Sequence, residues 1–201
     1  MSQNLKLTEM LCARFTHDII GPVGALSNGA EFLREELGSK PSIAADLIES
    51  SSREAVARVQ YYRQAYGYSP ANAPTSMDDV KELVQNYFAA SKIKLQWEKV
   101  PQGIQAGEKK LLLNLLIVAA GCLIRGGIIS IKIDGNYTIT AEGPKASLHE
   151  NSRKTLLGGT SEEEIDARLV QIYYTYMVGK ETSAKIEISE NPEQVIFSFR
   201  I

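Results

Sequence analysis

The sequence predicts an α+β protein in which a helical hairpin precedes a layer of helices on one face of a mostly antiparallel sheet. Three observations predict this class. Apolar residues recur at helical spacing from about residue 5 to residue 68. A stretch rich in proline, glycine and small residues follows, from residue 66 to residue 74. Beyond it, helical and alternating patterns are mixed. We therefore divide the chain into two domains, residues 1–70 and 71–201.

The first domain is predicted to contain two long helices, because its helical pattern is interrupted once, at residues 37–41. Gly38 is typical of a helix C-terminus and Pro41 of the first turn of a helix, so a short turn between antiparallel helices is expected. Two helices alone cannot cover both of their apolar stripes. A second copy would cover them, and we therefore predict a homodimer held by a four-helix bundle.

The second domain is predicted to form an α/β sandwich whose elements can be placed along the chain. Its last helix is expected to start at a capping box of Thr160 and Glu163 and to run to about Val178, with Gly179 at its end. The other predicted elements are a helix over 77–90, a strand over 93–99, an apolar helix over 108–125, a hairpin of 128–133 with 137–141 around Asp134-Gly135, and a closing hairpin of 184–189 with 194–201 around Asn191-Pro192.

Composition excludes several classes of function. A net charge of −2 without a long basic stretch argues against a nucleic-acid partner. The longest apolar run, residues 111–120, is too short to span a membrane, and the first residues lack the features of a signal peptide. Cys12 and Cys122 are predicted to be buried reduced thiols, and no cysteine or histidine cluster has metal-ligand spacing. We expect a cytoplasmic protein without a metal of its own.

One histidine, His17, lies on the face of the first helix opposite the apolar residues, where a core residue would not be expected. On a helical wheel, His17 points roughly 170° away from the centre of the apolar stripe. That stripe consists of Leu11, Phe15, Ile19, Pro22, Leu26, Ala30, Leu33 and Leu37. A histidine in a helix is ordinarily just a solvated or packed side chain, so His17 needs further support before a role is assigned.

The neighbours of His17 supply that support. Small or apolar residues share its side of the helix, where charges would be expected, and would let another protein approach the ring: Ala13, Ile20, Gly21 and Gly24. Pro22 should bend the helix locally. Asp18 follows directly, and a carboxylate beside an imidazole can orient it and raise its basicity. Together these features indicate an exposed, activated nucleophile.

Residues 15–23, which read Phe-Thr-His-Asp-Ile-Ile-Gly-Pro-Val, resemble the phosphoacceptor motif of two-component histidine kinases. The longer run from Leu11 to Gly29 resembles the ChpT-type histidine phosphotransferases of alphaproteobacteria. That resemblance extends to the two-domain layout and implies a dimerisation and phosphotransfer hairpin followed by a degenerate kinase-like ATPase domain. It implies that His17 becomes a phosphohistidine and relays phosphoryl groups between response-regulator receiver domains, with Asp18 orienting the ring.

The sequence departs from a true kinase at its nucleotide site. Residues 112–119 resemble the helix that carries a metal-binding asparagine, but Val118 stands at that position and Asn114 matches only an earlier asparagine. The next glycine-containing motif, at residues 141–145, lacks its aspartate and its second glycine, and Gly158-Gly159 is interpreted as a plain turn. We therefore expect a phosphotransferase that binds no ATP, with magnesium supplied by the partner receiver domain. Gly21 replaces the usual Thr or Asn, which predicts little phosphatase activity.

The remaining candidate residues are expected to dock the partner. If the two helices turn near residue 39, His17 lies opposite Tyr62, which brings Arg58 and Arg63 into range of a phosphate or a receiver. Arg14, Ile20, Gly21 and Gly24 complete the predicted docking set. Two alternatives remain open at this point: a non-catalytic dimeric adaptor for receiver domains, and an ATP-using histidine kinase core.

Overall fold

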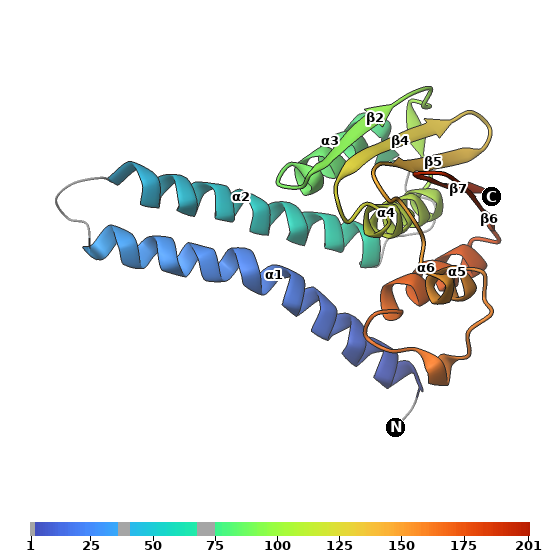
Figure 1. The fold of residues 1–201 in the computed structure, drawn as a ribbon, viewed down its shortest axis with the longest axis horizontal. Helices are drawn as coiled ribbons and strands as arrows, with labels where there is room; N and C mark the ends of the chain where they lie inside the picture. Colours follow the sequence, from blue (N-terminus) through green and yellow to red (C-terminus); the bar gives the residue numbers. More distant parts are fainter. Residues whose placement is uncertain (1–2, 36–40, 68–74) are drawn as a thin grey trace.

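The computed structural model describes residues 3–35, 41–67 and 75–201. Two long antiparallel helices, α1 (Gln3–Glu35) and α2 (Pro41–Tyr66), form a hairpin that extends away from the rest of the molecule (Figure 1). This confirms the predicted pair of helices, and α2 begins at the predicted proline. The predicted turn around Gly38 and most of the predicted linker lie outside the described residues.

Two residues of α1 shape the hairpin, one by allowing a close contact with α2 and one by bending the helix. Gly29 of α1 faces Ile48 of α2 so closely that a Cβ atom on the glycine would lie 2.7 Å from the Ile48 Cγ1 atom. Pro22 is buried inside α1, where its missing N–H and its ring disfavour a straight helix. Figure 1 shows α1 changing direction part-way along its length, as expected of a helix with an internal proline.

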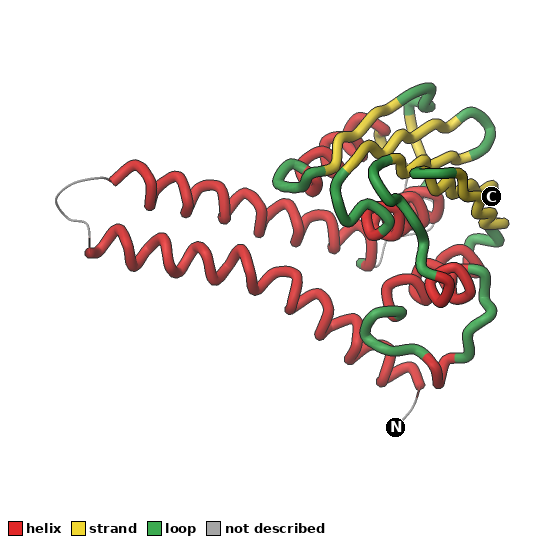
Figure 2. Tube along the Cα trace, in the orientation of Figure 1, coloured by secondary structure: helices red, strands yellow, loops and turns green. Residues whose placement is uncertain are grey.

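Beyond the hairpin, five strands form one sheet in the order β2-β4-β5-β7-β6 (Figure 2). Strand β2 pairs in parallel with β4, and the other neighbours are antiparallel. The sheet is therefore mostly antiparallel, as predicted. The strands are β2 (Ile93–Trp97), β4 (Gly127–Ile133), β5 (Tyr137–Glu142), β6 (Lys185–Asn191) and β7 (Gln194–Arg200). A separate pair of two-residue strands, β1 (Thr75–Ser76) and β3 (Gly103–Ile104), was not predicted.

Helices cover the apolar face of this sheet. Their bounds are α3 (Met77–Phe88), α4 (Ala106–Gly121), α5 (Glu150–Leu156) and α6 (Val170–Glu181), with a 3₁₀ turn, η1 (Glu162–Glu164). The apolar helix α4 is buried on nearly all sides because it contacts the sheet, α2 and α6. This arrangement confirms the predicted α+β class.

The start of the last helix was predicted wrongly. The capping box is made by Ser161 and Glu164 instead of Thr160 and Glu163, and it begins only the short turn η1. The side chain of Asp166 then accepts hydrogen bonds from the backbone N–H groups of Arg168 and Leu169. These bonds form a turn, so a new helix starts only at Val170. At the other end α6 continues past Gly179, whose missing side chain leaves room for Ile186.

Two smaller differences from the sequence-based expectations remain. Residues 150–156 form a helix that was not predicted, α5, and His149 is its N-cap, whose Nδ1 accepts the N–H of Asn151. Only one of the two cysteines is buried: Cys12 is exposed on α1, whereas burial raises the pKa of the Cys122 thiol to about 12. Cys12 lies beside the apolar stripe of α1, on a part of the helix surface that the described residues of this chain leave exposed.

The hairpin is attached to the rest of the molecule at the end where α2 finishes and α1 begins (Figure 1). The Tyr61 hydroxyl donates to the backbone carbonyl of Leu113, and the Asn114 amide donates to that of Ala65. On the α1 side, the first turns of the helix pack on α6 and η1, in a small apolar cluster of Leu7, Met10, Leu11, Ile165, Leu169, Val170, Tyr173 and Tyr176. None of the described helices is long and apolar enough to cross a membrane.

Candidate functional site

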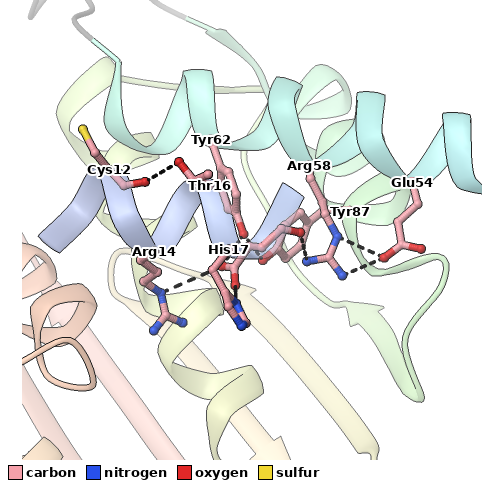
Figure 3. A network of polar contacts seen from close by, with 9 residues as sticks. Cys12, Arg14, Thr16, His17, Glu54, Arg58, Tyr62 and Tyr87 are labelled. Atoms are coloured by element: carbon pink, nitrogen blue, oxygen red, sulfur yellow. Dashed lines mark hydrogen bonds and ion pairs between the residues drawn. The ribbon is translucent and has the colours of Figure 1, made fainter. Parts of the chain in front are cut away.

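The predicted acceptor histidine is exposed on α1. The His17 side chain is 87% exposed, and its ring lies on the side of α1 away from α2 (Figure 3). Its Nδ1 atom is 3.4 Å from Oδ1 of Asp18. Because Nδ1 faces the carboxylate, Nε2 is the nitrogen left at the open end of the ring. A partner protein can therefore reach Nε2, while the Asp18 carboxylate on the opposite side of the ring orients it.

Asp18 joins the two helices of the hairpin. The second oxygen of its carboxylate, Oδ2, accepts a hydrogen bond of 2.8 Å from the hydroxyl of Tyr62 on α2. The Arg14 guanidinium lies 3.9 Å from the same oxygen, one helical turn before it on α1. Both oxygens of Asp18 are thus engaged, one by α2 and one by the candidate nucleophile. The structure places Tyr62 opposite His17, as predicted from the position of the turn.

The backbone of Asp18 is also bonded to α2, and Pro22 explains why. In an α-helix the carbonyl of residue 18 would accept the N–H of residue 22, but proline has none. Arg58 supplies the missing donor, since its Nη1 atom lies 3.1 Å from the Asp18 carbonyl oxygen. Glu54 holds the Arg58 guanidinium through bonds of 3.0 and 2.7 Å (Figure 3). Arg58 therefore serves the backbone of the site and does not project freely toward a ligand.

The charge state of these groups is set by their surroundings. Partial burial acts against the charged form of Arg58, but the hydrogen bond and the charge of Glu54 outweigh it and raise the pKa of Arg58. Burial, and after it the neighbouring Tyr87 and Asp18, raises the pKa of the Tyr62 hydroxyl far above its usual range. Tyr62 is accordingly a neutral donor at every physiological pH.

The surface around His17 is exposed and carries small and apolar residues. Ile20 is 63% exposed, and a Cβ atom added to Gly21 or Gly24 would meet nothing within 4 Å. Arg63 is exposed and its side chain makes no hydrogen bond or ion pair with the described residues, so the structure does not bring it to His17 as it brings Tyr62. The predicted set thus divides into residues that build the site and residues that surround it.

The helix that would carry a nucleotide-bound metal is used differently in this chain. Val118 is buried in the main core. Asn114 is fully buried, donates to Ala65 and accepts a 3.1 Å hydrogen bond from Gln171 on α6. The predicted turn at Gly158-Gly159 is confirmed as a turn after α5, where Gly158 has a φ of +80° and contacts the ring of Tyr176. Among the described residues, no three acidic, histidine or cysteine side chains are grouped to hold a metal ion.

Two residues of the site were missed by sequence reasoning. Glu54 holds Arg58, and its position four residues earlier on the same helix was an available signal. Tyr87 of α3 lies 3.5 Å from the Tyr62 hydroxyl, and its ring is 4.0 Å from that of Tyr61 between centroids. No signal in the sequence identifies Tyr87, because its contact depends on how α3 packs against α2.

Comparison with known proteins gives a consistent result. The family model described as the histidine phosphotransferase C-terminal domain matches residues 77–194. The protein phosphotransferase ChpT of Brucella abortus (strain 2308) is 36% identical over 200 residues, which cover 96% of this chain and 95% of the relative. A solved bacterial phosphotransferase superposes with a TM-score of 0.85 at 34% identity, covering 98% of this chain and 96% of its own. The histidine kinase AdeS of Acinetobacter baumannii matches with a TM-score of 0.41 at 15% identity, over 92% of this chain and 96% of its own.

Proposed function

Because this chain belongs to the ChpT-type histidine phosphotransferases, we propose that His17 is the residue that carries the phosphoryl group between receiver domains. The protein is a phosphotransferase by family. The observation that supports His17 in particular is its exposed ring, with Nδ1 turned to Asp18 and Nε2 facing outward. Such a nitrogen can be approached in line by a phosphorylated side chain of another protein.

The chemistry proposed for His17 needs no external proton donor. The Nε2 lone pair forms a bond to phosphorus while the bond between phosphorus and the donor's aspartyl oxygen breaks, and the donor regains a free carboxylate. Nδ1 keeps its proton, so the ring becomes positively charged, and Asp18 lies beside it to stabilise that charge. In the second half the aspartate of another receiver attacks phosphorus and the N–P bond breaks.

A relay between two receivers tests this proposal directly. A receiver labelled on its aspartate is mixed with a second, unlabelled receiver from the same genome, with magnesium and with or without this protein. We expect label on the second receiver only when the protein is present, with a transient labelled protein in between. If label never appears on the protein, or if it moves equally fast without it, then the chain is a non-catalytic adaptor.

We further propose that no ATP takes part and that the magnesium ion belongs to the receiver. The buried Val118 and the internal hydrogen bonds of Asn114 support this, because neither residue presents an oxygen to a nucleotide-bound metal. Incubation with labelled ATP and magnesium should leave the protein unlabelled, while the same sample accepts label from a phosphorylated receiver. Label incorporated from ATP alone would instead identify a kinase. We place the protein in the cytoplasm, with its receivers.

We propose that the protein forms a homodimer in which the exposed apolar residues of the hairpin are buried against a second copy. Val56 and Val59 on α2 are 53% and 50% exposed, and they lie on the side of α2 roughly opposite the buried Tyr61, which faces α4. Val23 on α1 is also about half exposed, on the helix face next to the apolar stripe. Valines with this much exposure on a long helical pair favour burial against a second copy, in a four-helix bundle.

Replacing Val56 and Val59 together with glutamate is expected to separate the dimer, because four charges would enter the apolar bundle core. Light scattering should show about twice the 22.1 kDa chain mass for the wild type and a single chain mass for the variant. Ile124→Glu is the control for adding charge to an exposed apolar site, since Ile124 is 94% exposed and follows α4, outside the two helices of the hairpin. A wild-type protein that is monomeric at working concentration would contradict this part of the proposal.

A further inference from the structure

The orientation of His17 depends on very few contacts. The side chain is 87% exposed, and within the part of the chain that the structure describes its ring has one polar neighbour, Oδ1 of Asp18 at 3.4 Å. An exposed imidazole that lacks a fixed partner samples several rotamers and both neutral tautomers. Whatever fixes the Asp18 carboxylate therefore also fixes the reactive nitrogen.

Tyr62 is well built for that task. Its hydroxyl donates to Oδ2 of Asp18 at 2.8 Å, and the residue is only 7% exposed. Its ring is held by Phe15 and Tyr66, with centroids at 5.2 and 5.7 Å, so the hydroxyl has little freedom to leave. Because Tyr62 has a single proton and gives it to Asp18, the 3.5 Å contact with Tyr87 is one in which Tyr87 donates.

The main chain of Asp18 is fixed from the same helix. Pro22 frees the Asp18 carbonyl, and Arg58 of α2 donates to it at 3.1 Å. Arg58 and Tyr62 are four residues apart and therefore lie on one face of α2, one helical turn from each other. One residue of α1 is thus bonded twice to α2, at its backbone and at its side chain.

We propose that Tyr62 is a positioning residue for the acceptor histidine, acting through Asp18 to keep Oδ1 against Nδ1 of His17. This inference rests on the proposed phosphotransfer at His17 and names how that site is set up. Held in this way, Asp18 favours the tautomer with a proton on Nδ1 and leaves the lone pair on Nε2 for attack on phosphorus. The same carboxylate then faces the positive charge that develops on the ring. Tyr62 touches neither the ring nor the phosphate and is not itself a catalytic residue.

Tyr62→Phe tests the inference because it removes the hydroxyl and keeps the ring. We expect phosphoryl transfer from a labelled receiver to slow about 10-fold or more, the size of effect seen when a supporting hydrogen bond behind a functional imidazole is lost. Tyr66→Phe is the matched control: it removes a hydroxyl from the same aromatic cluster, but that hydroxyl bonds to Gln171 and not to Asp18. The control should keep the wild-type rate of transfer.

A spectroscopic measurement separates positioning from a general loss of stability. The chain has two histidines, so the ¹⁵N ring signals of His17 and His149 can be assigned readily, and His149 serves as an internal reference. In the wild type we expect the neutral ring of His17 to be mainly in the Nδ1–H form. In Tyr62→Phe we expect that preference to fall, with His149 unchanged. An unchanged His17 tautomer in Tyr62→Phe would overturn the inference.

A double-mutant cycle identifies the route of the effect. In an Asp18→Ala background the oxygen that accepts the Tyr62 hydroxyl is already lost, so adding Tyr62→Phe should slow transfer little further. An equal slowing with and without the Asp18 carboxylate would mean that the hydroxyl acts elsewhere, and the inference would fail. If instead the wild type accepts no phosphate at all, the proposed function fails, while the tautomer measurement still decides the role of Tyr62.

Discussion

Replacing His17 with alanine is expected to abolish phosphoryl transfer while leaving the fold unchanged. The ring carries the only nitrogen that the proposed mechanism phosphorylates, so no residual transfer is expected from the rest of the chain. The cost in stability should be within about 0.5 kcal/mol, because His17 is exposed and its one polar contact is with the adjacent residue. Transfer of label from a phosphorylated receiver measures the first effect, and thermal unfolding measures the second.

His149→Ala is the matched control for this result. His149 is the other histidine of the chain, is exposed, and caps α5 far along the sequence from the hairpin. It should accept label at the wild-type rate, and the label on the protein should be lost in acid and kept in alkali, as expected of a phosphoramidate. Label that persists in His17→Ala, or that disappears in His149→Ala, would move the acceptor away from the proposed site.

The second large effect is expected at Asn114, where the change should affect stability and not transfer. Asn114→Ala removes the donor to the buried Ala65 carbonyl and the acceptor for Gln171, and it leaves a small cavity. We expect a loss of about 2–3 kcal/mol in the free energy of unfolding, from a buried carbonyl left without a partner together with the cavity. For a chain of this length that corresponds to a fall in Tm of roughly 5–10 °C.

Transfer activity checks that the role of Asn114 is structural. Its side chain is buried between α2 and α6, away from the surface that a receiver would contact. Here the rate at which folded protein accepts label from a receiver should be unchanged at a temperature well below the new Tm. Asn86→Ala, on the exposed side of α3, makes the same chemical change and should leave Tm within about 1 °C. An Asn114→Ala protein with wild-type Tm would show that its hydrogen bonds do not stabilise the fold.

Much of the architecture could be predicted because it depends on local patterns. The two helices of the hairpin, the strands of the sheet and the outward direction of His17 follow from spacing of apolar residues along single segments. The position of Tyr62 opposite His17 followed from helix geometry and from the expected position of the turn between the two helices. These features need no knowledge of how distant segments pack.

The features that were missed or predicted wrongly all depend on packing or on competing local bonds. Cys12 belongs to an apolar pattern but is exposed in the single chain, because periodicity does not show whether another surface covers it. The start of α6 was misplaced because the Asp166 side chain offers the backbone an alternative to continuing a helix. Arg58 was predicted as a candidate phosphate contact, whereas its guanidinium is occupied by Glu54 and by a carbonyl that Pro22 left free.

The double attachment of Asp18 has a consequence for how the two helices can move. An α-helix rises about 5.4 Å per turn, so a lengthwise slip of α2 by one turn would carry the donors of the 2.8 and 3.1 Å bonds out of hydrogen-bonding distance of Asp18. Both bonds would be lost together, because both come from one face of α2. If Asp18 orients His17 as proposed, the hairpin presents a correctly aimed imidazole in one longitudinal alignment of its helices, and a slip of one turn is expected to slow transfer.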